Sequence, residues 1–297
     1  MSLASSKIAR LLPQSLRWLT ATLVFLALVV VTRFALEVVG VPPAVVRFVS
    51  STAALCLAAI YLGAVAPLRG VQRFTQLLLP ATLLAFWTQG WVILATIVAG
   101  VLRLERSHFA GPEDYGNWAN LGKHVAAHLI AATVFTILVL ILMASTHFLR
   151  RWPITVGPAA VLGGLVIIRF WVEAMGVTPV RAAGWSSTVA LLICGFYLGG
   201  LGSCFGLHSA PRLLMPALVL GWTWRYWVFV ATLFGAAIPF YKTHFFDPSG
   251  GQVILRLARS LGAGAIEGLI AGLVVWGIAV WISCATRATE QGNRPLD

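Results

Sequence analysis

Eight long apolar runs constrain the fold of this chain more than any other feature of its sequence. Each run holds at least 21 residues, and roughly 20 helical residues are enough to cross the hydrocarbon core of a bilayer. A helix satisfies its own backbone hydrogen bonds, which lipid cannot do, and the sequence shows no alternating pattern of a membrane barrel. We therefore predict an all-α, polytopic transmembrane bundle with about eight helices, at 18–39, 44–66, 77–101, 125–148, 154–175, 182–202, 213–237 and 261–284.

The composition agrees with a membrane environment. Of the 297 residues, 59% are hydrophobic and 10% are charged, whereas about 25% are charged in a soluble domain. The formal net charge is +12, but the Lys and Arg residues are scattered over the predicted loops rather than clustered on one face. This distribution favours contact with anionic membrane lipids and argues against a nucleic-acid partner.

The sequence repeats itself at an offset of 136 residues. The stretch RFALEVVGVPP at 33–43 matches RFWVEAMGVTP at 169–179, and the matches continue without a gap. They include SST at 50–52 and 186–188, YLG at 61–63 and 197–199, and His-Phe at 108–109 and 244–245. Apolar composition alone does not align Arg, Glu, Pro, Ser and His in one register. We predict two tandem four-helix repeats, and because four is even, the repeats are parallel.

This duplication predicts the organisation of the chain. We expect a basic cytoplasmic leader at 1–17, repeats at 18–149 and 154–285, a linker at 150–153 and a polar tail at 286–297. The weak bias of Lys and Arg toward the amino-terminal side places both termini in the cytoplasm, in a plasma membrane or bacterial inner membrane. The loops at 102–124 and 239–260 are the sizeable hydrophilic segments, and they are where protein partners are expected to dock.

The repeated Arg and Glu residues are the first site candidates. Arg33 and Glu37, like Arg169 and Glu173, are four residues apart and share a helix face near the end of a predicted span. Because charge inside a bilayer is costly, each pair should face the bundle interior or water. One interpretation is a structural clamp at the end of the helix. The other is that both glutamates line an outward-open site for a cation or proton.

The repeated SST stretches supply hydroxyl candidates at Ser51 and Ser187. We expect them to lie about 12 Å along the second helix of each repeat, at the depth of the Arg–Glu pair. Two roles are open: a hydrogen bond to the glutamate of the neighbouring helix, or close packing of small residues.

Departures from the repeat mark a third group of candidates. His128 and Glu267 lie on equivalent helices, where the opposite repeat has Gly264 and Ala131, and they fall on the same helix face. Arg225 stands where the first repeat has Gln89 and is a competing partner for Glu267. These residues have two possible roles, a buried salt bridge or a path for a proton or cation. The sequence does not decide between the roles, or between His128 and Arg225 as the partner of Glu267.

Motifs for soluble chemistry are missing from the sequence. No His-Glu-x-x-His, phosphate-binding loop or Ser–His–Asp set can be assembled, so we predict no cofactor and no metal, and an enzyme is not favoured. The first functional hypothesis is a transporter or channel-like protein that moves a small solute or ion at the repeat interface. The alternative is a non-catalytic scaffold or docking subunit of a larger membrane complex.

Overall fold

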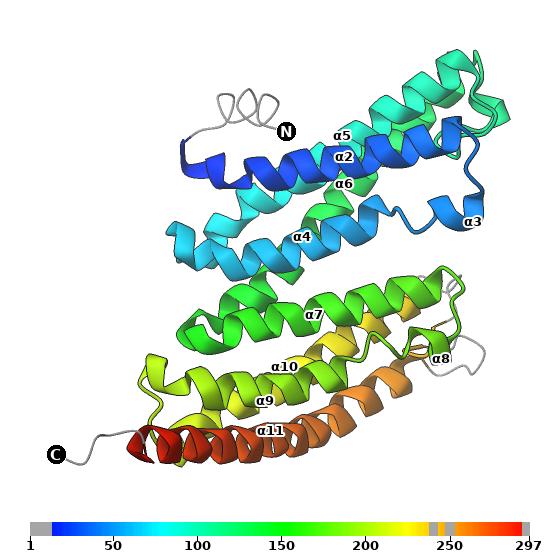
Figure 1. Cartoon of the computed structure of the whole chain (residues 1–297). Helices are drawn as coiled ribbons and strands as arrows, with labels where there is room; N and C mark the ends of the chain where they lie inside the picture. The colour runs from blue at the N-terminus through cyan, green and yellow to red at the C-terminus, as the bar shows by residue number, and fades with distance from the viewer. Residues whose placement is uncertain (1–13, 238–242, 247–252, 293–297) are drawn as a thin grey trace. The chain divides into compact units, whose positions relative to one another are not determined.

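The computed structural model describes residues 14–237, 243–246 and 253–292, with the side chains of 16–237, 243–246 and 253–286. Over these residues the protein is all-α (Figure 1). Eight of the described helical segments are long and apolar enough to cross a membrane, which confirms the predicted transmembrane bundle. They are Leu16–Val38, Pro43–Arg69, Phe74–Leu102, Trp118–Arg151, Pro153–Ala174, Pro179–Phe205, Ala210–Ala237 and Val253–Thr286.

The first compact unit, unit 1, comprises Met1–Phe148. Its long helices are α2 (Thr20–Val38), α4 (Ser51–Val65), α5 (Leu78–Leu102) and α6 (Trp118–His147). Helix α2 packs on α4 and α5, and α6 packs on the same two helices, so the four form a closed ring. The short elements are η1 (Gln14–Leu19), α3 (Pro43–Val46), η2 (Ala66–Arg69), η3 (Phe74–Leu77) and η4 (Pro112–Asp114).

The second compact unit, unit 2, comprises Leu149–Asp297. Its long helices are α7 (Pro153–Ala174), α9 (Ser187–Leu201), α10 (Ala210–Ala237) and α11 (Val253–Gly292). Helix α7 packs on α9 and α10, and α11 packs on the same two, which gives the ring order of unit 1. The short elements are η5 (Phe148–Arg151), α8 (Pro179–Ala182) and η6 (Gly202–Phe205).

Several element boundaries recur at the offset of the sequence matches. Helix α9 begins and ends 136 residues after α4, and η6 likewise follows η2. Gly40 and Gly176 both have positive φ, 84° and 89°. In each unit this glycine N–H and the next valine N–H bond the last turn of the preceding helix, which is a Schellman ending. The origin of the units by duplication, and the axis that relates them, stay predictions, as do the predicted domain boundaries.

Four of the predicted helix boundaries are wrong, two in each unit. The second helix of each unit is not continuous, because α3 and α8 are separate short helices and α4 and α9 begin only at Ser51 and Ser187. Helices α6 and α11 begin earlier than predicted, at Trp118 and Val253, so the last part of each predicted loop is helical. Hydropathy marks the lipid-facing stretch of a helix, and a helix continues beyond that stretch where its start is capped, as Asn117 caps α6. Residues 1–13 of the predicted leader at 1–17, part of the loop 239–260, and residues 293–297 of the predicted tail at 286–297 lie outside the described residues.

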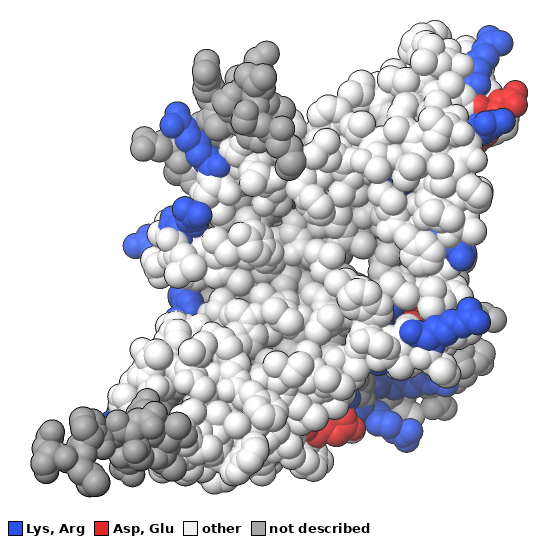
Figure 2. All heavy atoms as spheres, viewed as in Figure 1, with Lys and Arg blue, Asp and Glu red and all other residues white. Residues whose placement is uncertain are grey.

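Most of the basic side chains lie toward the helix ends. On the face shown in Figure 2, Lys and Arg side chains lie toward the ends of the helices, and the middle of the helices shows mostly uncharged atoms. Aliphatic side chains such as Ile130, Val134 and Ile266 are more than half exposed in α6 and α11. Exposed aliphatic side chains along the middle of a spanning helix are suited to contact with acyl chains.

Candidate functional site

Glu37 sits at the end of α2 and is surrounded by hydrogen-bond donors. Arg33 donates from Nε to Oε1 over 3.3 Å, and the backbone N–H of His108 donates to Oε2 over 3.1 Å. The His108 imidazole Nδ1 lies 2.5 Å from Oε1. The neighbouring Phe109 packs edge-on against Phe34, with ring centroids 5.8 Å apart. The repeated Arg-Phe and His-Phe pairs therefore meet at one place: Arg33 and His108 bind Glu37, and Phe34 packs on Phe109.

Glu173 has the same surroundings in unit 2. Arg169 donates from Nε over 3.0 Å, and the His244 backbone N–H donates over 2.8 Å. His244 Nδ1 lies 2.6 Å from Oε2, and Phe245 packs against Phe170 at 6.2 Å. The Glu173 side chain is 1% exposed, so its carboxylate is shut off from solvent and its acceptor positions are filled.

These two clusters, the Glu37 clamp and the Glu173 clamp, have balanced charge. Each holds one guanidinium and one carboxylate, so the histidine is not needed as a cation. Burial lowers the pKa of His108; the Glu37 carboxylate acts in the opposite direction and Arg33 adds to the lowering. A saturated, charge-balanced carboxylate that ties a loop to a helix end is suited to a structural clamp, the first of the two roles predicted for it, and the choice between the two roles stays a prediction.

The serine candidates do not reach the glutamates. Ser50 and Ser186 are the N-caps of α4 and α9, and their hydroxyls accept from the backbone N–H of Ala53 and Val189. Ser187 accepts from the indole N–H of Trp224 at 3.0 Å. Ser51 occupies the first position of α4. We expected these hydroxyls to lie well inside a helix, and that placement is wrong. The helix is interrupted just before each SST stretch, and the first serine of the stretch takes the N-cap position, which serine favours.

Arg225 and Glu267 form an ion pair near the middle of α10 and α11. Arg225 Nη1 lies 2.8 Å from Glu267 Oε2, and the Glu267 side chain is 50% exposed. The guanidinium Nε is buried without a hydrogen-bond partner, and the guanidinium carbon lies 5.4 Å from the Trp224 ring centroid. Within unit 2, Glu267 thus contacts Arg225, one of the two partners considered for it; its pairing with His128 of unit 1 stays a prediction.

A hollow of about 200 Å³ adjoins this ion pair. Arg225 is one of its walls, and aromatic rings and small residues of α10 and α11 supply the others. The lining residues are Trp222, Arg225, Tyr226, Phe229, Ser260, Leu261, Gly264 and Ala265. Gly264 has no side chain, and the guanidinium Nε lies 3.4 Å from the position that a Cβ of residue 264 would take.

Unit 1 has a chain of polar side chains in the corresponding place. His128 Nδ1 lies 3.0 Å from Oε1 of Gln89, the residue that Arg225 matches. The His128 ring stacks on His124 with centroids 5.1 Å apart, and His124 Nδ1 lies 3.0 Å from Asp114 Oδ2. Sequence reasoning had singled out His128 but missed His124 and Asp114. The i,i+4 spacing of the two histidines was the available signal.

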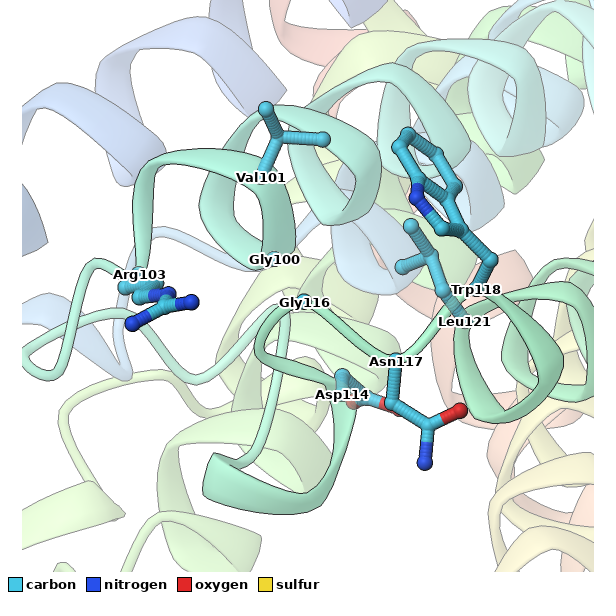
Figure 3. A pocket seen from close by; sticks show the side chains of 8 residues that line it. All are labelled: Gly100, Val101, Arg103, Asp114, Gly116, Asn117, Trp118 and Leu121. Carbon is cyan, nitrogen blue, oxygen red and sulfur yellow. The ribbon is translucent and has the colours of Figure 1, made fainter.

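Asp114 stands at the loop end of this chain, outside the spanning segments. Burial raises the pKa of Asp114, but the Gly111 N–H and His124 outweigh it and hold that pKa below its ordinary value. A hollow of about 100 Å³ lies between the end of α5, the η4 turn and the start of α6; Figure 3 shows the residues that line it. Asp114, Arg103 and Trp118 are among its lining residues.

The fold and these sites define the class of the protein. It is a multi-pass, α-helical integral membrane protein. Among the described residues, no group of three or more His, Cys, Asp or Glu side chains is arranged to hold a metal ion. Comparisons with family models, with curated proteins and with solved structures give no match to this chain.

Proposed function

We propose that this protein moves a small solute or ion across a membrane, and that the Arg225–Glu267 pair of unit 2 binds it. The supporting observation is that this ion pair lies mid-helix, beside a hollow, with half of the Glu267 side chain exposed. An ionised side chain at the centre of a bilayer costs several kcal/mol by most estimates. Charged residues at this depth typically mark the pathway of an ion or substrate, which compensates for their cost.

The contrast with the two clamps gives the reason to choose this pair. In the clamps, each glutamate is buried and bonded by an arginine, a histidine and a backbone N–H. In the Arg225–Glu267 pair, one carboxylate side chain is half exposed and one guanidinium nitrogen has no acceptor. A site that must exchange its ligand needs such unfilled positions. An ion is the favoured cargo because two opposite charges beside a hollow of about 200 Å³ suit a small charged species.

Flux into proteoliposomes tests this proposal. The purified protein is reconstituted, and the uptake of protons, sodium, rubidium and chloride is compared with that of protein-free liposomes. We expect at least one of these ions to move faster with the protein, and Glu267→Gln to remove at least nine-tenths of that flux (about 1.4 kcal/mol per factor of ten). Glu105→Gln, at an exposed loop carboxylate, is the matched control and should keep it. Flux at the protein-free rate for all four ions refutes the proposal.

The loop of unit 1 supports a second function, a docking subunit of a membrane complex. The loop is held at His108 by Glu37 and at Gly111 by Asp114, so it presents a fixed surface. Glu105, Arg106 and Glu113 are exposed on it. Under this proposal, purification in mild detergent brings a partner at constant ratio, and reversing the three charges releases that partner while the fold remains. Purification as a single species contradicts it.

The side of the membrane is also part of the proposal. We place both termini in the cytoplasm, in a plasma membrane or bacterial inner membrane, on the basic residues at the amino-terminal side. Membrane lipids are the expected surroundings, and the loops at 102–124 and 239–260 are the proposed docking segments for proteins.

A further inference from the structure

Two stacked histidines of unit 1 carry an inference that the transport proposal does not use. His124 and His128 lie one turn apart in α6, with ring planes 16° from parallel and centroids 5.1 Å apart. Each ring has one polar partner: Asp114 for His124 and Gln89 for His128, both at 3.0 Å. Asp114, His124, His128 and Gln89 thus form a continuous row of polar side chains. This row runs from the loop end of the bundle to Gln89, near the middle of α5.

The partners determine which ring nitrogens carry hydrogen. An ionised aspartate only accepts, so His124 Nδ1 carries the hydrogen toward Asp114. With Oε1 of Gln89 facing it, His128 Nδ1 also carries a hydrogen. Each neutral ring then has its free lone pair on Nε2, and within the described residues neither Nε2 makes a hydrogen bond. The row has two vacant basic nitrogens inside a spanning helix.

The surrounding charges allow one added proton and resist a second. Two imidazolium rings stacked at this distance repel each other, and Asp114 supplies a single negative charge. The other charged or titratable groups around the row are His108 from the loop, Arg103 from the end of α5, Lys123 from α6, and Glu113, next to Asp114 on η4. The first three are neutral or cationic at neutral pH. The Glu113 carboxylate is exposed to solvent, which screens it, so it adds little of the negative charge that a second imidazolium needs.

The row is open at its loop end. Asp114 borders the hollow of about 100 Å³ shown in Figure 3, and a space of this size accommodates a few water molecules. The His124 side chain is one-third exposed. Beyond His128, the buried residues of α6 are apolar as far as Met143: Ala132, Val139 and Leu142. A proton can thus enter from the loop side. The hydroxyls next along α6, those of Thr133 and Thr136, already donate to carbonyls of their own helix.

We propose that His124 and His128 form a binding site for a single proton, entered from the loop side of unit 1 past Asp114. A hydronium ion gives its proton to Nε2 of either ring and leaves as water, so one O–H bond breaks as the N–H bond forms; the site returns to neutral when that N–H bond gives the proton back to water. The pair is thus a proton-binding site within the membrane. Its role in driving a transport cycle rests on the proposed function, whereas the binding itself does not.

Nitrogen NMR on the full chain in lipid nanodiscs tests the binding directly. With ¹⁵N-labelled histidine, the signals of the two rings are assigned with His124→Gln and His128→Gln and followed from about pH 8 to about pH 5. We expect both rings to respond over the same pH interval, with a summed change equal to one imidazolium. In each single variant, the remaining ring should reach a full imidazolium by itself. His208→Gln, at an exposed turn in unit 2, is the control and should leave the pair unchanged.

Two results overturn the proton site: two full imidazoliums in the wild-type pair, or no protonation of either ring. Because the wild-type measurement needs no substitution, a variant that fails to fold does not prevent a decision. Proton flux into proteoliposomes is measured on the same samples. A single shared proton without any flux contradicts the transport proposal and leaves the site intact, whereas flux without the shared proton contradicts the site alone.

Discussion

Glu173→Gln tests the structural role of the Glu173 clamp. The substitution keeps the size of the side chain and removes its charge. The wild-type carboxylate receives Arg169 Nε at 3.0 Å and the His244 backbone N–H at 2.8 Å, and His244 Nδ1 lies 2.6 Å from it. The Gln carbonyl oxygen remains an acceptor, but the amide nitrogen then faces donors instead of accepting from them. At least one donor therefore loses its partner.

The size of the loss follows from these contacts. A hydrogen bond to a charged group contributes about 1.5–3 kcal/mol, and an unpaired buried charge raises the cost to about 3–5 kcal/mol. The side chains of Arg169 and His244 are 20% and 35% exposed, so water replaces part of what they lose. We expect the free energy of unfolding to fall by about 2–4 kcal/mol. Glu37→Gln should cost less, because Glu37 is 8% exposed and its arginine is 3.3 Å away.

Unfolding of the purified variants in mixed micelles, by titration with SDS, measures these losses. Glu105→Gln, at an exposed loop position, is the control and should stay within about 0.5 kcal/mol of the wild type. Flux per folded molecule should be unchanged in Glu173→Gln. A variant as stable as the wild type that has lost its flux would show that Glu173 binds the transported ion, which refutes the clamp.

Three further predictions concern packing, pH and topology. A Cβ at Gly221 would meet the backbone of Gly268 and Gly272, so Gly221→Ala should force α10 and α11 apart and cost about 1–3 kcal/mol. A Cβ at Gly277 would meet nothing within 4 Å, so Gly277→Ala should not lower the stability. Equal stability of Gly221→Ala and Gly277→Ala in the SDS titration would contradict the close approach of α10 and α11 at Gly221. Because the pKa of His108 lies below its ordinary 6.5 in the fold, the unfolded chain binds its proton first as the pH falls through 6.5. Stability should therefore decrease from that pH toward the folded pKa, and His108→Gln should decrease less; parallel curves contradict this. Cys204 is exposed on η6, so with Cys284→Ser an impermeant maleimide should label it only after the cells are opened; labelling of intact cells contradicts the cytoplasmic termini.

The spans and the clamp pairs were predictable because their signals are local. Hydropathy over about 20 residues identifies a crossing, and the i,i+4 spacing alone predicts the Arg33–Glu37 and Arg169–Glu173 contacts. The glycine that ends each first helix was also predictable, because a helix often ends on a residue with positive φ and glycine adopts that conformation at the least cost. Gly40 and Gly176 have such a φ in the structure.

The remaining features depend on tertiary contacts or on boundaries that hydropathy does not mark. His108 and His244 reach glutamates 71 residues away along the chain, and their recurrence in the repeat was the available hint. The breaks before Ser51 and Ser187 fall inside predominantly apolar runs, so hydropathy averaged over a whole span does not mark them. Only the packing of α10 on α11 determines that Glu267 meets Arg225.

Access of water to the hollow beside Arg225 tests the central proposal most directly. Ala265 lines that hollow, whereas Ile270 is 57% exposed and does not line it. In a chain with Cys204 and Cys284 replaced by Ser, the variants Ala265→Cys and Ile270→Cys are treated with a charged, water-soluble thiol reagent during a flux measurement. We predict that the reagent modifies Ala265→Cys and stops its flux, while Ile270→Cys stays unmodified. Absence of modification at both positions, with flux unaffected, would contradict an ion site at the Arg225–Glu267 pair.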